Sequence, residues 1–417
     1  MTAGDFSLPP VAGEPAMPEV ARPASGADQP HRRPSALGET FRDPVPHSAP
    51  YRFVMARADD LDRLRRLRRR LQRCREWVHC RQPFFEHWEA DLSTCAIDEA
   101  GPLLPEACLA SVAKAAERWF GQPLSSRVKL LAHRMEAGHH SELHNDNPRF
   151  GHETHRLNLY LNDDWHDGVG GRLRVAASNE PHTDDIAIRP TIGTVMVFEA
   201  SPHSFHGVDR VAGGQRYSIL FYLWHAGNTP EVRTAVADSL ARAAPARERV
   251  CSRAAGLIEL LRSAGAGEVG FGASTLLEQA VRSAALLASW GAPEPAWLAA
   301  LLQLVDDEVL ADAGSALPGA DIDAGTLAAA AAIALSLGQA SPAGGDPRLA
   351  AAAAGLRFSN IVAGLPALDF SHAAWLAHRG AFVRDRAALP SPARSLGAAL
   401  FDHPLPATEL PGEAGVG

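Results

Sequence analysis

Histidines, acids and asparagines are concentrated in the stretch "HSELHNDNPRFGHETHRLNLYLNDDW", residues 140–165. Within it His144 and Asp146 stand two positions apart, and residues two apart project from the same face of a strand. That spacing would place an imidazole beside a carboxylate, and both groups are ligands of transition metals. Two ligands hold an ion poorly, so we expect a third from elsewhere, and "SPHSFHGVDRV" offers His203 or His206.

Two histidines and one carboxylate on one face, with the other coordination positions open, form the ligand set of non-haem Fe(II) oxygenases. Arg216 opens the run "RYSILFYLW" ten residues after His206, and Ser218 shares its face. Because a guanidinium pairs bidentately with a carboxylate, these two residues are candidates to anchor the distal carboxylate of 2-oxoglutarate. Asn158 and Tyr160 share a face of "LNLYLN", where the Tyr160 phenol could add a hydrogen bond. The alternative is that both pack inside a barrel.

The elements that must position these residues read as β-structure from about 125 to 225. Short runs such as "RVKLLAHRM", "HRLNLYLN", "GRLRVAA", "DIAIRP", "GTVMVFEA" and "RYSILFYLW" are broken by Gly, Asp, Asn and Pro. Several short strands separated by turn residues predict a sandwich or jelly roll. Before them, residues 59–77 carry leucines at helical spacing, with Asp59 or Asp60 available as the N-cap.

The remaining regions differ in composition. Residues 1–50 are rich in Pro, Gly and Ala without a hydrophobic period, and we predict that they are disordered. From 245 to 402 the chain is rich in Ala and Leu with helical periodicity, and 403–417 is predicted to be a disordered tail. The expected fold is therefore α+β, with a jelly-roll domain over 51–228 followed by an all-helical domain.

The segment from about 128 to 225 resembles the Fe(II)- and 2-oxoglutarate-dependent dioxygenases of the prolyl-4-hydroxylase-like superfamily, whose fold is a double-stranded β-helix. The motifs H-x-D, "YLNDDW", "GGRL", "FHGV" and R-x-S occur in the order found in such enzymes. "HNDNP" and "YLNDDW" resemble the hypoxia-factor prolyl hydroxylase branch. "AHRMEAG", "HND" and "ETHRLNLYLN" also resemble bacterial relatives encoded beside peptide-modifying radical enzymes.

The resemblance implies that His144, Asp146 and His206 are the iron ligands and that Arg216 anchors 2-oxoglutarate. It also implies O2 as co-substrate, with ascorbate as a candidate reductant. His206 is preferred to His203 because it precedes "GV" and stands at the right distance from Arg216. One departure is that relatives carry a tyrosine about ten residues before the first ligand, where this chain has "HRME" with Arg134. The co-substrate pocket or the substrate mouth is therefore expected to be built differently.

Other histidines of this region are spread along the sequence. They are interpreted as too scattered for a second metal site, and as solvated or facing the substrate: His139, His140, His152, His155 and His166.

The helical region resembles a family related to HD-type metal domains. The "WGAP" turn of that family is intact, but Gln279 and Gln303 stand where its members carry histidine. Glutamine is a much poorer transition-metal ligand than imidazole. We therefore expect a degenerate HD-like domain that has lost its metal chemistry and serves a structural or peptide- or protein-binding role.

The whole composition limits the partners and the compartment. The chain has 417 residues, 46% of them hydrophobic, with a net charge of −8, which argues against general nucleic-acid or membrane-surface binding. Its five cysteines form no C-x-x-C pair and are interpreted as reduced thiols of a cytoplasmic protein. The most apolar run, residues 326–337, is short for a membrane span and is expected to be a buried helix.

The leading hypothesis is a hydroxylase that oxidises a C–H bond of a peptide or protein residue and releases succinate and CO2. One alternative substrate class is a free amino acid or small natural-product metabolite. A second alternative is a non-catalytic sensor or scaffold that binds 2-oxoglutarate without turnover. The presence of all three expected ligands favours the enzyme, because the fold alone does not decide function.

Overall fold

The computed structural model describes two compact units. The described residues are 36–93, 102–146, 149–163, 165–182, 185–267, 270–271, 274–305, 309–310, 321–338, 346–367 and 370–407. The first unit, here called the sheet unit, contains the chain up to 146 together with Thr154–Trp224. The second, the helical unit, contains His225–Pro404 and a short segment described over 149–153.

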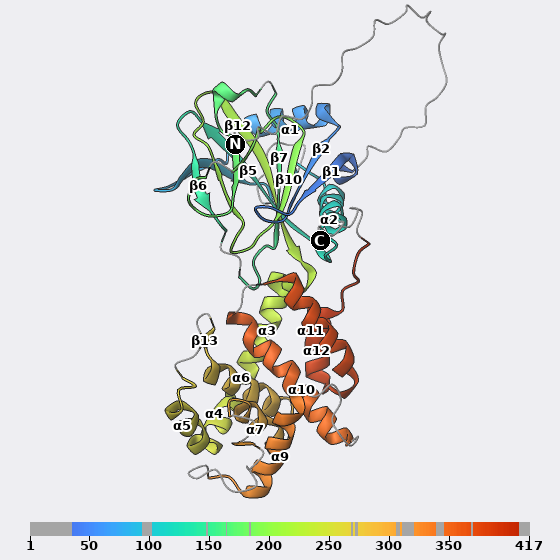
Figure 1. The fold of residues 1–417 in the computed structure, drawn as a ribbon. Coiled ribbons are helices and arrows are strands. Elements are labelled where there is room, and N and C mark those ends of the chain that lie inside the picture. The colour runs from blue at the N-terminus through green and yellow to red at the C-terminus, as the bar shows by residue number, and fades with distance from the viewer. Residues whose placement is uncertain are drawn as a thin grey trace, which may run out of the picture. The chain divides into compact units, whose positions relative to one another are not determined.

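A curled antiparallel sheet of 12 strands makes up the sheet unit (Figure 1). Its order is β1-β2-β10-β7-β12-β5-β4-β6-β11-β8-β9, and β3 pairs with β4 beside this path. The strands are β1 (Phe41–His47), β2 (Phe53–Ala58), β3 (Val78–Gln82), β4 (Phe85–Asp91), β5 (Leu124–Glu136), β6 (Ser141–His144), β7 (His155–Tyr160), β8 (Leu173–Ala176), β9 (Ile186–Ile188), β10 (Thr194–Glu199), β11 (Phe205–Val208) and β12 (Gln215–His225). The predicted jelly-roll fold is confirmed, and each run quoted from 125 to 225 contains one of these strands.

Along the central strands, successive side chains point alternately to a hydrophobic core on one face of the sheet and to a cavity on the other. On β7, Leu157 and Leu159 are fully buried in the main hydrophobic core, whereas Asn158 and Tyr160 line a cavity. The core face is covered by two helices, α1 (Leu61–Arg73) and α2 (Glu106–Phe120), whose leucines, alanines and aromatic residues join the same cluster. Successive side chains of a strand point to opposite faces, so one short sequence supplies both the core and the site.

The beginning of the sheet unit differs from the prediction. Residues 37–40 form a short 3-10 helix, and β1 (Phe41–His47) pairs with β2, so the predicted disorder over 1–50 is wrong for this part. Residues 1–35 lie outside the described residues. The predicted helix at 59–77 is present as α1, and Asp60 caps it by accepting a hydrogen bond from the backbone of Arg63.

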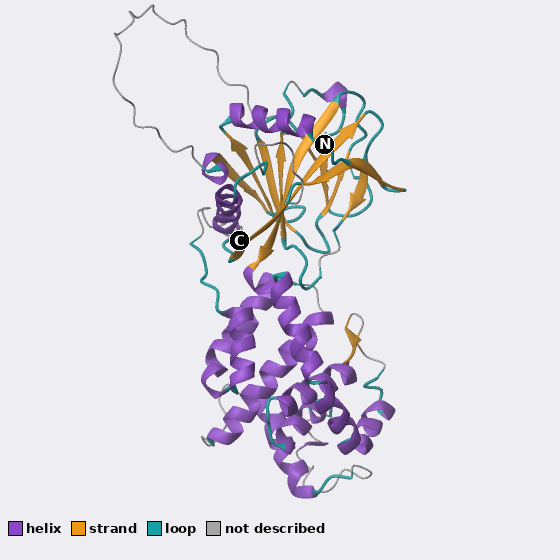
Figure 2. Ribbon diagram, turned by 180° about the vertical axis from the view of Figure 1, so that it is seen from behind, coloured by secondary structure: helices purple, strands orange, loops and turns teal. Residues whose placement is uncertain are grey.

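The helical unit, whose helices are purple in Figure 2, begins earlier than residue 245, because α3 (Pro230–Arg242, labelled in Figure 1) already belongs to it. The other helices are α4 (Ala244–Arg253), α5 (Ala255–Ser263), α6 (Leu276–Ser289), α7 (Glu294–Leu302), α9 (Ala324–Leu335), α10 (Pro347–Gly364), α11 (His372–Asp385) and α12 (Ser391–Phe401). The apolar run predicted as a buried helix forms α9 and the turn after it. Among the helices the structure describes, none has the length and apolar character needed to span a membrane.

Candidate active site

Two neighbouring strands bring the site histidines together. In the antiparallel pairing of β6 with β11, His144 lies directly opposite His206. Their ring centroids are 4.7 Å apart and the ring planes are inclined by 46°. His203 lies in the turn before β11, is exposed, and does not join this group. The structure therefore pairs His144 with His206, as the sequence predicts.

Asp146 completes the group, although not by the strand geometry predicted for it. Strand β6 ends at His144, so Asp146 follows the strand instead of extending it. Its Oδ1 lies 3.6 Å from His144 Nε2, and its Oδ2 lies 3.4 Å from His206 Nε2. The neighbouring Asn145 donates a side-chain hydrogen bond to the Pro202 carbonyl at 2.6 Å, which ties this turn to the one preceding β11. The side chains of His144, Asp146 and His206 thus lie together beside this loop contact.

The backbone sets the tautomer of both histidines. His144 Nδ1 lies 2.8 Å from the Glu142 carbonyl, and His206 Nδ1 lies 2.9 Å from the Ser204 carbonyl. An Nδ1–H that donates to a carbonyl leaves the Nε2 lone pair free for a metal. Burial also lowers the pKa of His206 to about 4, which keeps its imidazole neutral at physiological pH. The donor set thus fits a divalent transition metal.

The carboxyl group of Asp146 has a pKa below its usual range. Burial alone would raise that pKa, but the positive charge of Arg156 and the nearby histidines more than offset the effect. Arg156 Nη1 lies 2.8 Å from Asp146 Oδ2. Asp146 is therefore ionised, as a metal ligand must be.

Arg216 is a buried cation on the cavity face of β12. Its Nε donates to the Gly171 carbonyl at 2.9 Å, and its Nη1 lies 3.5 Å from Ser218 Oγ and 3.7 Å from Met135 Sδ. Within the described parts of the chain, no carboxylate pairs with this guanidinium, and burial lowers its pKa. A buried guanidinium without an anion fits a ligand that carries a carboxylate.

Tyr160 and Asn158 lie on the same cavity face, on the neighbouring strand β7. Tyr160 is opposite Ser218 in register, and the Arg216 guanidinium lies 5.1 Å from its ring centroid. Its hydroxyl is buried and has no hydrogen-bond partner among the residues described. Burial raises the pKa of Tyr160 to about 12 although Arg216 acts against that rise, so the phenol stays a donor. The four residues predicted to hold the co-substrate therefore share one wall.

Comparisons with known proteins agree with this geometry. Residues 130–224 match the family model of the 2OG-Fe(II) oxygenase superfamily. The chain carries a 2OG-Fe(II) oxygenase domain. It is accordingly a 2-oxoglutarate-dependent dioxygenase, with Fe(II), 2-oxoglutarate and O2 as the cofactors and co-substrates that this family implies. A search of the curated proteins found no significant match.

Several solved structures are similar to this oxygenase domain. A Trichoplax adhaerens prolyl hydroxylase, in complex with a hypoxia inducible factor peptide fragment, is 16% identical, with a TM-score of 0.35 over 42% of this chain and 83% of that chain. A Pseudomonas putida prolyl-4-hydroxylase is 20% identical, with a TM-score of 0.34 over 42% and 92%. HygX from Streptomyces hygroscopicus, with nickel and 2-oxoglutarate bound, is 14% identical, with a TM-score of 0.32 over 42% and 82%.

The oxygenase domain holds these residues in one cavity of about 460 Å³. Besides the predicted residues, its lining includes several that the sequence analysis did not single out: Phe84, Phe85, His87, Glu89, His133, Arg156 and Tyr222. A signal for Arg156 was present, because it stands two positions before Asn158 on the same strand and so shares its face. The arginine also lies 4.3 Å from the ring centroid of Tyr222.

Arg134 and Met135 lie at the position where the sequence departs from the expected tyrosine. Met135 lines the cavity and contacts Arg216, whereas Arg134 faces the other way and lies over the rings of Trp77 and Trp88, 5.0 Å from each centroid. A thioether thus stands on the co-substrate wall of this oxygenase domain.

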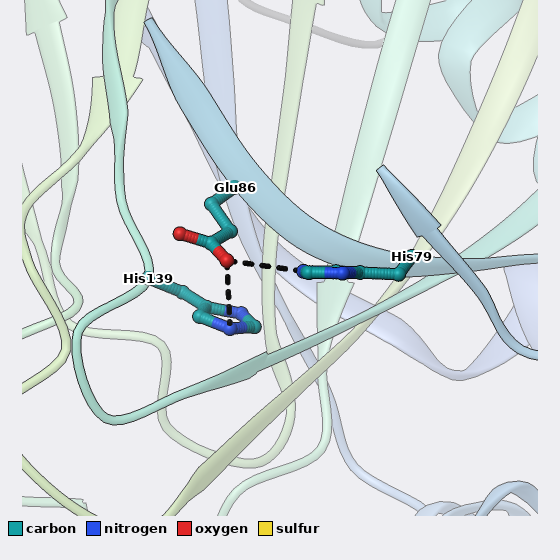
Figure 3. Close-up of side chains that lie close together, drawn as sticks. All are labelled: His79, Glu86 and His139. Atoms are coloured by element: carbon teal, nitrogen blue, oxygen red, sulfur yellow. Dashed lines mark hydrogen bonds and ion pairs between the residues drawn. The ribbon is translucent and has the colours of Figure 1, made fainter. Parts of the chain in front are cut away.

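The interpretation of the other histidines is wrong in two places. His139 joins His79 around Glu86, whose Oε1 lies 3.9 Å from His139 Nε2 and 3.1 Å from His79 Nε2 (Figure 3). The other correction concerns His155, which is fully buried and packs edge-on against Phe120 at 4.7 Å. Both corrections come from contacts between residues that are distant in the sequence.

A second His–Glu–His group faces the cavity itself. Glu89 Oε2 lies 3.3 Å from His133 Nε2 and 3.9 Å from His87 Nε2. The rings of His87 and His133 are stacked, with centroids 4.1 Å apart and planes inclined by only 21°. Glu86 and Glu89 lie on opposite faces of β4, since they are three residues apart in a strand.

The two glutamines of the helical unit have different surroundings. Gln303 and Asn360 exchange hydrogen bonds at 2.8 and 3.2 Å, and Asn360 also accepts one from Ser283 at 2.6 Å. Gln279 has a buried Nε2. No group of metal-ligating side chains occurs in the described part of the helical unit.

Proposed function

We propose that this chain is a hydroxylase that oxidises a C–H bond of a peptide or protein residue, with release of succinate and CO2. One observation carries the proposal. A single cavity contains the group His144, Asp146 and His206 together with Arg216, which has no carboxylate partner among the described residues. When bound, iron(II) supplies the redox chemistry that couples decarboxylation of 2-oxoglutarate by O2 to oxidation of the substrate. The fold alone would not support this assignment.

The protein's part in the reaction is to hold and orient. His144, Asp146 and His206 would hold the metal on one side and leave the remaining positions open toward the cavity. Arg216 would pair with the distal carboxylate of 2-oxoglutarate, and Ser218 and Tyr160 would donate hydrogen bonds to it. Asn158, on the same face as Tyr160, would contact the co-substrate from β7.

A peptide substrate is supported by the sequence motifs and by the mouth of the cavity. The motifs "HNDNP" and "YLNDDW" resemble enzymes that hydroxylate prolines in proteins. Phe84, between β3 and β4, lines the cavity while 43% of its surface is exposed. An exposed aromatic side chain at the rim is suited to pack against a chain that extends beyond the cavity.

The test is anaerobic titration with Fe(II) and 2-oxoglutarate, followed by O2 and measurement of succinate, with and without ascorbate. Asp146→Ala and His206→Ala should lose the metal-dependent absorption and succinate release. His203→Ala is the matched control and should keep both, since its side chain lies outside the ligand group. Full metal occupancy in Asp146→Ala would contradict the ligand assignment.

A further inference from the structure

Glu89 is a carboxylate on the cavity wall without a cationic partner. Its side chain is 33% exposed, and among the described residues the ion-pair contacts from His133 and His87 both go to its Oε2. Among the residues that the structure describes, no lysine or arginine nitrogen lies within 4.0 Å of this carboxylate. The second oxygen, Oε1, therefore remains available to a ligand.

The charges of the cavity lining single out Glu89. Four lining residues are formally charged: Glu89, Asp146, Arg156 and Arg216. Arg156 is paired with Asp146, and Arg216 has the geometry to receive the co-substrate's carboxylate. The imidazole of His133 is neutral, since burial lowers its pKa to about 4. Among the charged residues described in this lining, Glu89 is the one without an arginine or lysine partner and without an assigned co-substrate contact.

The ligand atoms of His87, Glu89 and His133 lie within 4.8 Å of one another, but the two histidine rings are stacked face to face with their centroids 4.1 Å apart. A ring-nitrogen lone pair lies in the plane of its ring, so an ion in the plane of one of these rings would lie out of the plane of the other. The rings of His144 and His206 are inclined by 46° instead. As Nε2–H tautomers, His133 and His87 would hold the carboxylate in place from one side.

Flat rings line the cavity that Glu89 faces. His87 is stacked between His133 and Phe85, whose centroid lies 5.1 Å away, and Phe84 and Tyr222 line the same cavity. Aromatic faces attract ammonium and guanidinium groups and pack against the methylene stems that carry them. We propose that Glu89 binds the basic group of a lysine or arginine side chain of the peptide substrate. The proposal rests on the proposed peptide hydroxylase function.

The experiment is affinity selection under anaerobic conditions with the full chain, Fe(II) and 2-oxoglutarate. The probe is a pool of acetylated, amidated hexapeptides randomised at every position, and the readout is the residue frequency among retained peptides. A charge-assisted hydrogen bond contributes about 1.5–3 kcal/mol, so lysine and arginine should be enriched about tenfold or more over glutamine.

The variants assign the enrichment to one carboxylate. Glu89→Gln should abolish the enrichment of lysine and arginine. Glu89→Lys should enrich acidic residues instead. Because there are two variants, the test remains valid if one of them folds poorly. Glu86→Gln is the matched control, because Glu86 is held by two histidines on the opposite face of β4 (Figure 3). Absence of enrichment in the unmodified chain, or its persistence in Glu89→Gln, would overturn the proposal.

Two further measurements separate this proposal from its premise. The Fe(II)–2-oxoglutarate absorption in the same samples reports on the proposed function. If that absorption does not appear, the peptide selection is repeated with metal-free protein, and its result still tests the role of Glu89. Zn²⁺ is then added to Asp146→Ala and to the Asp146→Ala/Glu89→Gln double variant. A stoichiometric ion in the first that is lost in the second would make Glu89 a metal ligand and overturn the proposal.

Discussion

Arg216 is the residue whose surroundings most directly require an anion. If its guanidinium pairs with the distal carboxylate of 2-oxoglutarate, Arg216→Ala should leave metal binding nearly unchanged and weaken co-substrate binding. The cost of an uncompensated buried charge is about 2–5 kcal/mol, or tens- to thousands-fold in Kd. Arg216→Lys should recover part of the affinity, because it keeps the charge but loses the planar fork.

Titrating 2-oxoglutarate against the anaerobic Fe(II) absorption measures these affinities. Arg210→Ala removes an exposed arginine from the preceding turn and should leave the Kd unchanged. Equal affinities in the Arg216 variants and the unmodified chain would rule out this residue as the anchor.

His133 makes the stability of the metal-free protein depend on pH. Its pKa is about 4 in the folded chain because of burial, against about 6.5 for an unfolded histidine. The unfolded state therefore binds the proton first as the pH falls, and stability is lost between about pH 6.5 and 4. At pH 5 this amounts to about 2 kcal/mol.

His133→Gln should accordingly lose less stability than the unmodified chain when the pH is lowered from 7.5 to 5. Urea unfolding of the metal-free proteins at both values measures the difference. His203→Gln, in an exposed turn, should behave as the unmodified chain does. An identical acid loss in His133→Gln would show that this imidazole is not the group that titrates.

A residue of the candidate site could be predicted from the sequence where its signal lies in nearby residues, and not where it depends on pairing between distant strands. His144, Asp146, His206 and Arg216 were found because their spacing and order are visible along the chain. Glu89 was not found, since it meets His133 only through the pairing of β4 with β5, which joins residues 44 positions apart. The local geometry of Asp146 was also misjudged, because a strand period does not report where the strand ends.

The close pairing of β11 with β6 depends on Gly207. A Cβ at this position would lie 2.7 Å from the Ser141 carbonyl oxygen and 2.9 Å from the Glu142 backbone, which are atoms that cannot move aside freely. Gly207→Ala should therefore push β11 from β6 and separate His206 from His144, although all three ligands remain. We expect metal affinity to fall about tenfold or more, equivalent to about 1.4 kcal/mol.

Co²⁺ titration of the purified protein measures this affinity. Gly213→Ala is the control, since a Cβ there would meet nothing within 4 Å, and it should bind Co²⁺ normally. Normal binding by Gly207→Ala would mean that the strands tolerate a shift without moving the ligands.

Among the elements, the strands of the jelly roll were easier to predict than those at its edge. The runs from 125 to 225 combine β-branched and aromatic residues with clear turn residues. Strand β1, "FRDPVPH", contains two prolines and an acid, and it is held by pairing with β2 instead of by its own propensity. Because its composition is rich in proline, this strand was not predicted and was assigned to the disordered region.

Across the whole chain, three groups of two histidines and one carboxylate occur in the described residues, and the geometry distinguishes them. Only the rings of His144 and His206 are strongly inclined, at 46°, and both donate Nδ1–H to backbone carbonyls. The ring pairs beside Glu86 and Glu89 are inclined by 21° each. In the described part of the helical unit no such group exists.

We therefore expect the complete chain to bind one tight equivalent of Co²⁺ or Fe²⁺. Asp146→Ala should reduce this to none, whereas Glu86→Gln and Glu89→Gln should each retain one equivalent. Gel filtration followed by metal analysis by atomic emission gives the stoichiometry directly. Two or three equivalents would mean that the groups around Glu86 and Glu89 also bind an ion although their histidine rings are stacked. The number of bound ions thus tests whether ring orientation, and not composition alone, makes a metal centre in this protein.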